Sequence, residues 1–154
     1  MKKINQILLD NISSQAKSCE RLRKTHDFHD SSDDLIQRFL NAFEPGTYVT
    51  PHMHDNKREI FIILSGKLVF VIFDDKGMII EYTILDPRSG SYGVEIQPKT
   101  WHTVVALESN TVCYEIKDGP YDQSTDKIFA TWAPKEGDDN SKKYLDNIIS
   151  KLNI

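Results

Sequence analysis

Three histidines and one glutamate have the types and the spacing of a metal site. His52 and His54 are two positions apart in a strand-like segment, and side chains at that spacing point to one face of a strand. Glu59 enters the next apolar run, where an ionised carboxylate is costly unless it is paired or coordinated. His102 begins a later apolar run. Neutral imidazoles and a carboxylate suit a divalent transition metal, so we expect these four residues to hold one metal ion.

Histidines by themselves are weak indicators of a metal site. We expect His26 and His29 to be solvent-facing or hydrogen-bonded residues rather than ligands. Metal binding requires neutral imidazoles, so the affinity of the predicted site should fall as the pH drops through the range in which histidine is protonated.

The predicted ligands lie in a chain that becomes strand-like at Gln37. Short apolar runs there alternate with turn signals at intervals of roughly ten residues, which is typical of a sandwich or barrel. The run Ile60–Leu64 is apolar without alternation, which favours a strand that is covered on both faces. Closure into a barrel or jelly roll would remove exposed sheet edges. The expected strands are 37–43, 46–52, 59–64, 67–74, 78–84, 92–96, 101–107 and 111–117.

Helical patterns flank the strand region. Apolar residues recur at helical spacing over 4–17, and the polar segment 21–30 is expected to be a loop. After Gly119–Pro120 the strand pattern ends, and apolar residues from Tyr144 to Leu152 predict a short C-terminal helix. We expect one domain over 1–154, divided into an N-terminal helix and loop (1–35), a β-barrel (36–120) and a C-terminal tail with a helix (121–154).

Composition narrows the function classes. The 154 residues carry a formal net charge of −4, which disfavours a protein that binds nucleic acid through a broad basic face. No apolar run approaches the length of a membrane span, and the N-terminus does not have the pattern of a secretion signal. Cys19 and Cys113 form neither a disulfide framework nor a zinc motif, so we expect free thiols and a cytoplasmic location.

The spacing of Gly46, His52, His54, Glu59 and Gly66 resembles the first motif of the cupin superfamily. That resemblance implies an all-β cupin jelly-roll barrel, also called a double-stranded β-helix, with turn glycines at Gly46 and Gly66. It implies that His52, His54 and Glu59 are ligands, and that the second cupin motif supplies His102. The second motif matches less well. Gln97, Lys99 and Ala106 stand where it has proline, glycine and asparagine.

The chain also resembles the WbuC family of cupin-fold metalloproteins, from the N-terminal helix to Gly137. Met53 is a departure, because that family is expected to have arginine there. Members are associated with gene clusters for bacterial surface polysaccharide (O-antigen), which implies a role in sugar metabolism. The segments that carry the resemblance are 38–49, 93–96, 101–103, 115–122 and 132–137.

Several polar side chains within or beside apolar strands are candidates for a pocket near the metal. Glu115 and Tyr121 are candidate acids or bases. The candidate substrate-binding residues are Arg38, Asn41, Lys117 and Trp101. The alternative for this set is a structural ion pair or a strand edge facing water, and for Trp101 it is packing against the barrel wall.

Two further features are open to more than one interpretation. The basic residues Arg21, Arg23 and Lys24 could bind phosphate at the barrel mouth or could belong to a solvated loop. Cys113 is expected to be a small core residue, with cysteine-dependent oxidation as a lesser alternative.

Three functions fit these observations. The first is an enzyme that isomerises or epimerises a sugar or nucleotide sugar, with the metal as a Lewis acid. The second is an iron-dependent dioxygenase, and the third is a non-catalytic metal-dependent sensor or binding module. The expected cofactor is one divalent ion of iron, zinc, manganese or nickel. The expected partner is a small molecule, with no nucleic acid or membrane, and family analogy makes a homodimer plausible.

Overall fold

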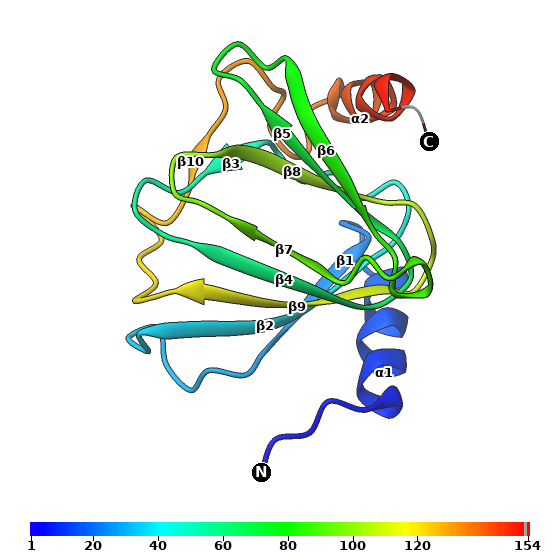
Figure 1. The fold of residues 1–154 in the computed structure, drawn as a ribbon, viewed down its shortest axis with the longest axis vertical. Helices are drawn as coiled ribbons and strands as arrows, with labels where there is room; N and C mark the ends of the chain where they lie inside the picture. Colours follow the sequence, from blue (N-terminus) through cyan, green and yellow to red (C-terminus); the bar gives the residue numbers. More distant parts are fainter. Residues whose placement is uncertain (153) are drawn as a thin grey trace.

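Two five-stranded antiparallel sheets face each other and form a jelly-roll barrel (Figure 1). The computed structural model describes residues 1–152 and 154. The first sheet has the order β1 (Arg23–Asp27), β2 (Ile36–Phe43), β9 (Thr111–Asp118), β4 (Glu59–Ser65) and β7 (Gly93–Ile96). The second has the order β10 (Ile128–Phe129), β3 (His52–Met53), β8 (Trp101–Ala106), β5 (Leu68–Phe73) and β6 (Ile79–Leu85). This architecture confirms the predicted fold class.

Alternation along the strands separates an inner face from an outer one. Phe61 and Ile63 of β4 point inward and are buried against Phe70 of β5 and Cys113 of β9. This apolar cluster fills one part of the space between the sheets. The polar residues of the same inner faces, such as Glu59, therefore gather in the remaining part.

Each sheet carries one helix on its outer face (Figure 1). Helix α1 (Gln6–Lys17) packs Ile12 and Ala16 against Leu40 of β2, and the Asn5 side chain caps its first turn. Helix α2 (Ser141–Lys151) packs Ile148 against Val69 of β5. Both terminal helices were predicted. No helix within 1–152 has the length and apolar character needed to cross a membrane.

The predicted strands were wrong in three places. The expected loop 21–30 contains β1, a polar edge strand that pairs with β2 through its backbone and shows no apolar alternation. The expected strand 46–52 is reduced to His52–Met53: the Thr47 N–H closes a turn on the Glu44 carbonyl, and Pro51 has no N–H to donate to a ladder. Strand β10 was not predicted, since two residues carry no periodic signal.

The run Ile60–Leu64 also differs from its prediction. It was expected to be covered on both faces, but Ile62 is 39% exposed on the outer face of β4. Helix α1 covers β2 and β9 of this sheet, so the outer face of β4 remains partly open to water.

The predicted turn glycines are confirmed, and Gly66 is the more constrained of the two. Gly46 and Gly66 have φ values of 92° and 73°. A Cβ at Gly66 would lie 2.6 Å from the Cα of Thr111, so the neighbouring strand would have to move. We expect Gly66→Ala to destabilise the fold by roughly 3 kcal/mol or more in urea titrations, from backbone strain plus the clash.

Gly90→Ala is the matched control for that measurement. Gly90 has a φ of 82°, but nothing lies within 4 Å of the position that a Cβ would occupy there. Its substitution should cost only the backbone strain, roughly 1 kcal/mol. Equal losses in the two variants would show that the contact with Thr111 is unimportant.

Candidate metal centre

The four predicted ligands meet inside the barrel. Strands β3 and β8 pair His52 directly with His102, while Glu59 is the first residue of β4. The ligand atoms of these residues and His54 all lie within 4.8 Å of one another, and all four residues are buried. The Glu59 carboxylate lies 3.1 Å from Nε2 of His54 through one oxygen and 3.1 Å from Nε2 of His102 through the other.

Backbone carbonyls fix the orientation of all three imidazoles. Nδ1 of His52 lies 3.0 Å from the Thr50 carbonyl, and Nδ1 of His102 lies 2.9 Å from the Thr100 carbonyl. Nδ1 of His54 contacts the carbonyl of Asp126. A carbonyl only accepts, so each Nδ1 carries the proton and each neutral ring presents an unprotonated Nε2. Such contacts are the usual support of metal-binding histidines.

The interior of the quartet lacks a partner that a cation would supply. Nε2 of His54 and Oε2 of Glu59 are buried and form no hydrogen bond. Three imidazole lone pairs and a carboxylate directed at one point would repel one another without a positive charge between them. The donor set of three nitrogens and one carboxylate therefore fits a divalent transition metal.

Electrostatics keep the ligands in the form that binds a metal. Burial lowers the pKa of His52 well below its usual value, and the positive charge of Lys127 lowers it further. Burial alone would raise the pKa of Glu59, but positive charge on the side of His102 and His54, which a metal ion between the ligands would supply, holds it well below the usual value. A neutral His52 and an ionised Glu59 are the forms required of ligands.

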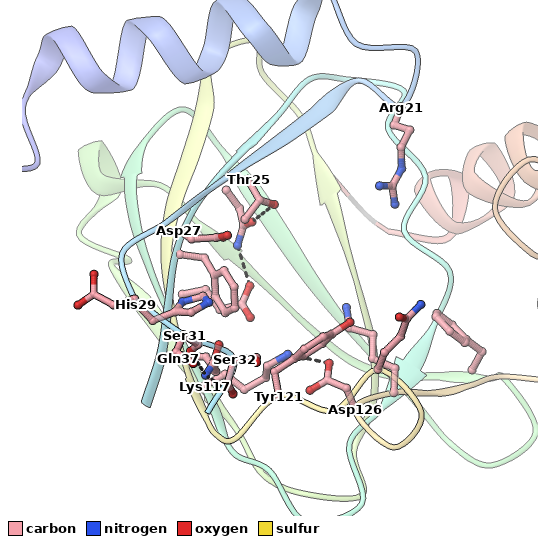
Figure 2. Close-up of a pocket in the computed structure, with 17 residues that line it drawn as sticks. Arg21, Thr25, Asp27, His29, Ser31, Ser32, Gln37, Lys117, Tyr121 and Asp126 are labelled. Atoms are coloured by element: carbon pink, nitrogen blue, oxygen red, sulfur yellow. Dashed lines mark hydrogen bonds and ion pairs between the residues drawn. The ribbon is translucent and has the colours of Figure 1, made fainter. Parts of the chain in front are cut away.

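Two connected cavities lead from the metal centre to the surface. The inner cavity, about 210 Å³, is lined by His52, Glu59 and His102 among other residues. The outer cavity, about 850 Å³, opens beside it and is drawn in Figure 2. Both are lined by Arg21, Thr25, Asn41, Glu115 and Lys127. A ligand that reaches the metal would therefore pass these five residues.

Glu115 is the ionisable group best placed for proton transfer. Burial raises the pKa of its carboxyl to about 7, and the negative charge of Glu59 contributes to the rise. The Asn41 amide donates to Glu115 Oε2 at 2.7 Å, and the Thr25 hydroxyl donates to the Asn41 amide oxygen at 2.8 Å. These two hydrogen bonds link the neighbouring strands β1, β2 and β9 and orient the Glu115 carboxyl. A carboxyl that titrates near neutrality is suited to acid–base chemistry.

A buried ion cluster supports the other side of the centre. The Asp126 carboxylate accepts from Lys57 at 2.9 Å and from Lys117 at 2.8 Å. All three side chains are less than a tenth exposed. Because the Asp126 carbonyl also contacts His54, the cluster positions one of the four candidate ligands. Figure 2 shows Asp126, Lys117 and Tyr121 together along one side of the outer cavity.

The structure brings some of the predicted pocket residues together and leaves others apart. Asn41, Glu115, Lys117 and Tyr121 line the outer cavity. Arg38 lines neither cavity and lies 3.4 Å from Asp34 in an ion pair. Trp101 packs near Trp132 on the α2 side of the second sheet, and its indole N–H donates to Asp75. Packing against the barrel wall, the alternative considered above, describes Trp101.

Two of the three basic residues expected at the barrel mouth, Arg21 and Arg23, are paired with an acidic residue. Arg21 and Arg23 both bind the Glu136 carboxylate, and Arg23 also donates to the Tyr48 carbonyl. Lys24 is exposed and lines neither cavity.

The remaining cysteine and histidines are explained by local structure. Cys113 is fully buried in the apolar cluster between the sheets, and burial raises the pKa of its thiol well above the usual value. A protonated core thiol does not suit cysteine-dependent oxidation. His26 is exposed, as expected, and His29 contacts the backbone of Arg38.

Three residues of the site were not singled out from the sequence. Lys57 lies between the predicted ligands His54 and Glu59, and a lysine beside an apolar strand was the available signal. Asp126 and Lys127 lie in a polar segment without periodicity, where the sequence offers no sign that the chain returns to the barrel.

A known protein family matches slightly more than half of the chain. The family described as "Domain of unknown function (DUF6016)" matches residues 4–85. This chain belongs to that family. The DUF6016 match includes His52, His54 and Glu59 but ends before His102. No curated protein matches the sequence.

Solved structures with low sequence identity share the fold of this DUF6016 chain. An uncharacterised Klebsiella pneumoniae protein with a double-stranded β-helix domain has a TM-score of 0.53 at 12% identity, covering 70% of this chain and 79% of its own. The capsular polysaccharide assembling protein CapF from Staphylococcus aureus has a TM-score of 0.55 at 23% identity, covering 68% of this chain and 29% of its own. The DMSP lyase DddQ from Ruegeria pomeroyi has a TM-score of 0.55 at 16% identity, covering 73% and 54%.

Proposed function

We propose that this protein is a metal-dependent enzyme that isomerises or epimerises a sugar or nucleotide sugar. The observation that carries the proposal is the position of Glu115, a carboxyl with a pKa near 7 that lines the same inner cavity as the ligands His52, Glu59 and His102. Moving a proton between neighbouring positions of a substrate needs one such group and a means to stabilise negative charge.

Different residues of the cavity would bind the metal and transfer the proton. His52, His54, Glu59 and His102 would hold the metal, which would polarise a carbonyl or hydroxyl oxygen of the bound sugar as a Lewis acid. In an isomerisation, Glu115 would remove the proton from the carbon next to that carbonyl and return it to the former carbonyl carbon, while the hydroxyl proton passes to the former carbonyl oxygen. In an epimerisation, Glu115 would remove the proton and a proton from water would return to the same carbon on its opposite face. Asn41 and Thr25 hold the Glu115 carboxyl in place.

The choice of a sugar rests on two kinds of support. The resemblance to the WbuC family links the chain to surface-polysaccharide gene clusters, and CapF is a capsular polysaccharide assembling protein. CapF is longer than this chain, and DddQ shares the fold although it is a DMSP lyase. The fold therefore supports several chemistries, and the proposal depends on Glu115 and the cavity.

Glu115→Gln tests the proposal through solvent proton exchange. We expect the metal-loaded wild-type protein to incorporate deuterium from D₂O into one member of a panel of sugars and nucleotide sugars, detected by NMR. The exchange should rise with pH through the Glu115 titration, with a midpoint at or below about 7, because a base must be ionised and a bound cation lowers the pKa of a nearby carboxyl. The glutamine variant should bind the same compound and exchange it at least a hundredfold more slowly.

Other results would favour the alternative functions. Bound iron together with oxygen uptake and no deuterium exchange would favour a dioxygenase. Tight binding of a compound that is recovered unchanged and unexchanged would favour a binding module. An unchanged exchange rate in Glu115→Gln would contradict the role assigned to this carboxyl.

A further inference from the structure

We infer that Lys127 anchors an anion subsite beside the metal centre, so that the substrate is a hydroxylated small molecule carrying a carboxylate or phosphate group. The inference deepens the proposed function and rests on it for the identification of the cavity as the substrate site.

Lys127 is the lysine of this region that lacks a partner. Its neighbours Lys57 and Lys117 share the carboxylate of Asp126. Within residues 1–152, the Lys127 ammonium group makes no hydrogen bond or ion pair, although Lys127 lines both cavities. Lys127 is exposed to solvent at the cavity, while the protein around its ammonium group lowers the pKa of that group by partial burial. An unpaired cation at such a position is costly unless an anion joins it.

The carboxylates around Lys127 do not supply a partner for its ammonium group. The carboxylates that act on Lys127 are Glu115, Glu59 and Asp126, while Lys117 opposes them. Asp126 already serves two lysines, and a metal held by Glu59 would offset the charge of that carboxylate. Glu115 accepts a hydrogen bond from Asn41 and forms no ion pair with Lys127 within residues 1–152. With a metal bound, the inner end of the passage is therefore positive.

The mouth of the cavity is a poorer place for the anion. Arg21 and Arg23 are both bound to Glu136, and Asp27 lines the outer cavity as well. Figure 2 shows Arg21 apart from the cluster formed by Lys117, Tyr121 and Asp126. An anionic group would bind deeper, at Lys127, where a neighbouring oxygen of the same molecule can face the metal ligands. A neutral sugar would leave Lys127 unpaired.

The test compares three probes on the metal-loaded full-length protein by calorimetry. D-Glucose is the neutral probe, D-glucuronate carries a carboxylate, and D-glucose 1-phosphate carries a phosphate. We expect wild type to bind at least one anionic probe tenfold or more tightly than glucose, as one charge-assisted contact allows. Lys127→Met should lose this preference, and Lys127→Arg should retain part of it.

Lys76→Met is the matched control, because Lys76 lies in the exposed β5–β6 turn and lines neither cavity. It should bind all probes as wild type does. Metal content and melting temperature report whether each variant remains folded and loaded. Lys127→Met should hold metal at least as tightly as wild type, since it loses a positive charge near His52.

The two anionic probes distinguish a carboxylate subsite from a phosphate subsite. The inference is overturned if wild type shows no preference for either anion, or if Lys127→Met keeps the preference. The proposed function fails separately. If an anion binds through Lys127 but shows no deuterium exchange, the enzymatic proposal is contradicted and the anion subsite is supported. Deuterium exchange of a neutral sugar at equal rates in wild type and Lys127→Met would support the enzymatic proposal and contradict the anion subsite.

Discussion

The double variant His52→Ala, His54→Ala is expected to bind Zn²⁺ at least about a hundredfold more weakly than wild type, because it removes two of four convergent ligands. A competition titration against a chromophoric chelator measures the difference. Excess metal should also raise the melting temperature of wild type and leave that of the double variant unchanged, since only a folded protein with the complete site binds the ion.

His26→Ala is the control for this pair. His26 is exposed on β1 and lies outside the ligand quartet, so its removal should leave zinc affinity unchanged. Equal zinc affinity in wild type and the double variant would show that zinc binds elsewhere on the chain.

Asp126→Asn is expected to destabilise the fold by about 3–5 kcal/mol, because it leaves the buried ammonium groups of Lys57 and Lys117 without their shared carboxylate. Urea unfolding at neutral pH measures the loss. Asp55→Asn removes an exposed carboxylate that lies 3.5 Å from Lys99, and it should change stability by less than about 1 kcal/mol. Equal effects of the two substitutions would contradict the importance of the buried cluster.

The effect of Asp126→Asn should also depend on pH. Burial tends to raise the pKa of Asp126, but the bonds from Lys117 and Lys57 outweigh it and lower the pKa below the usual value. A carboxyl with a lowered folded-state pKa stabilises the protein above the unfolded-state pKa, near 4, and loses that contribution as the pH falls further. The gap between wild type and Asp126→Asn should therefore narrow below pH of about 4.

The convergence of the four candidate ligands could be predicted because their side-chain types and spacing are local in the sequence. His52 and His54 share a face at a separation of two residues, and Glu59 is an acidic residue at the start of an apolar strand. The fold followed from the alternation of apolar runs with turns. Gly66 is an example, since its positive φ is a requirement that glycine meets without strain.

Other parts of the site depend on contacts that no local pattern encodes. Strand β1 was missed because its polar residues pair through the backbone, yet it supplies Thr25 to the chain that orients Glu115. Asp126 and Lys127 reach the cavity because the segment after β9 returns along the barrel. For Arg38, the sequence showed a cation in a strand but could not show which face of β2 it occupies relative to the cavity.

The metal content of the wild-type protein, purified without a metal-affinity tag, tests the central claim most directly. Mass spectrometry should find about one equivalent of a divalent transition metal per chain, held by the quartet of three imidazoles and one carboxylate. Zinc, manganese or nickel would lead to the exchange assays described above, and iron would lead to oxygen-uptake assays. A protein that holds no metal as purified, and takes up none when dialysed against these four ions, would contradict the account.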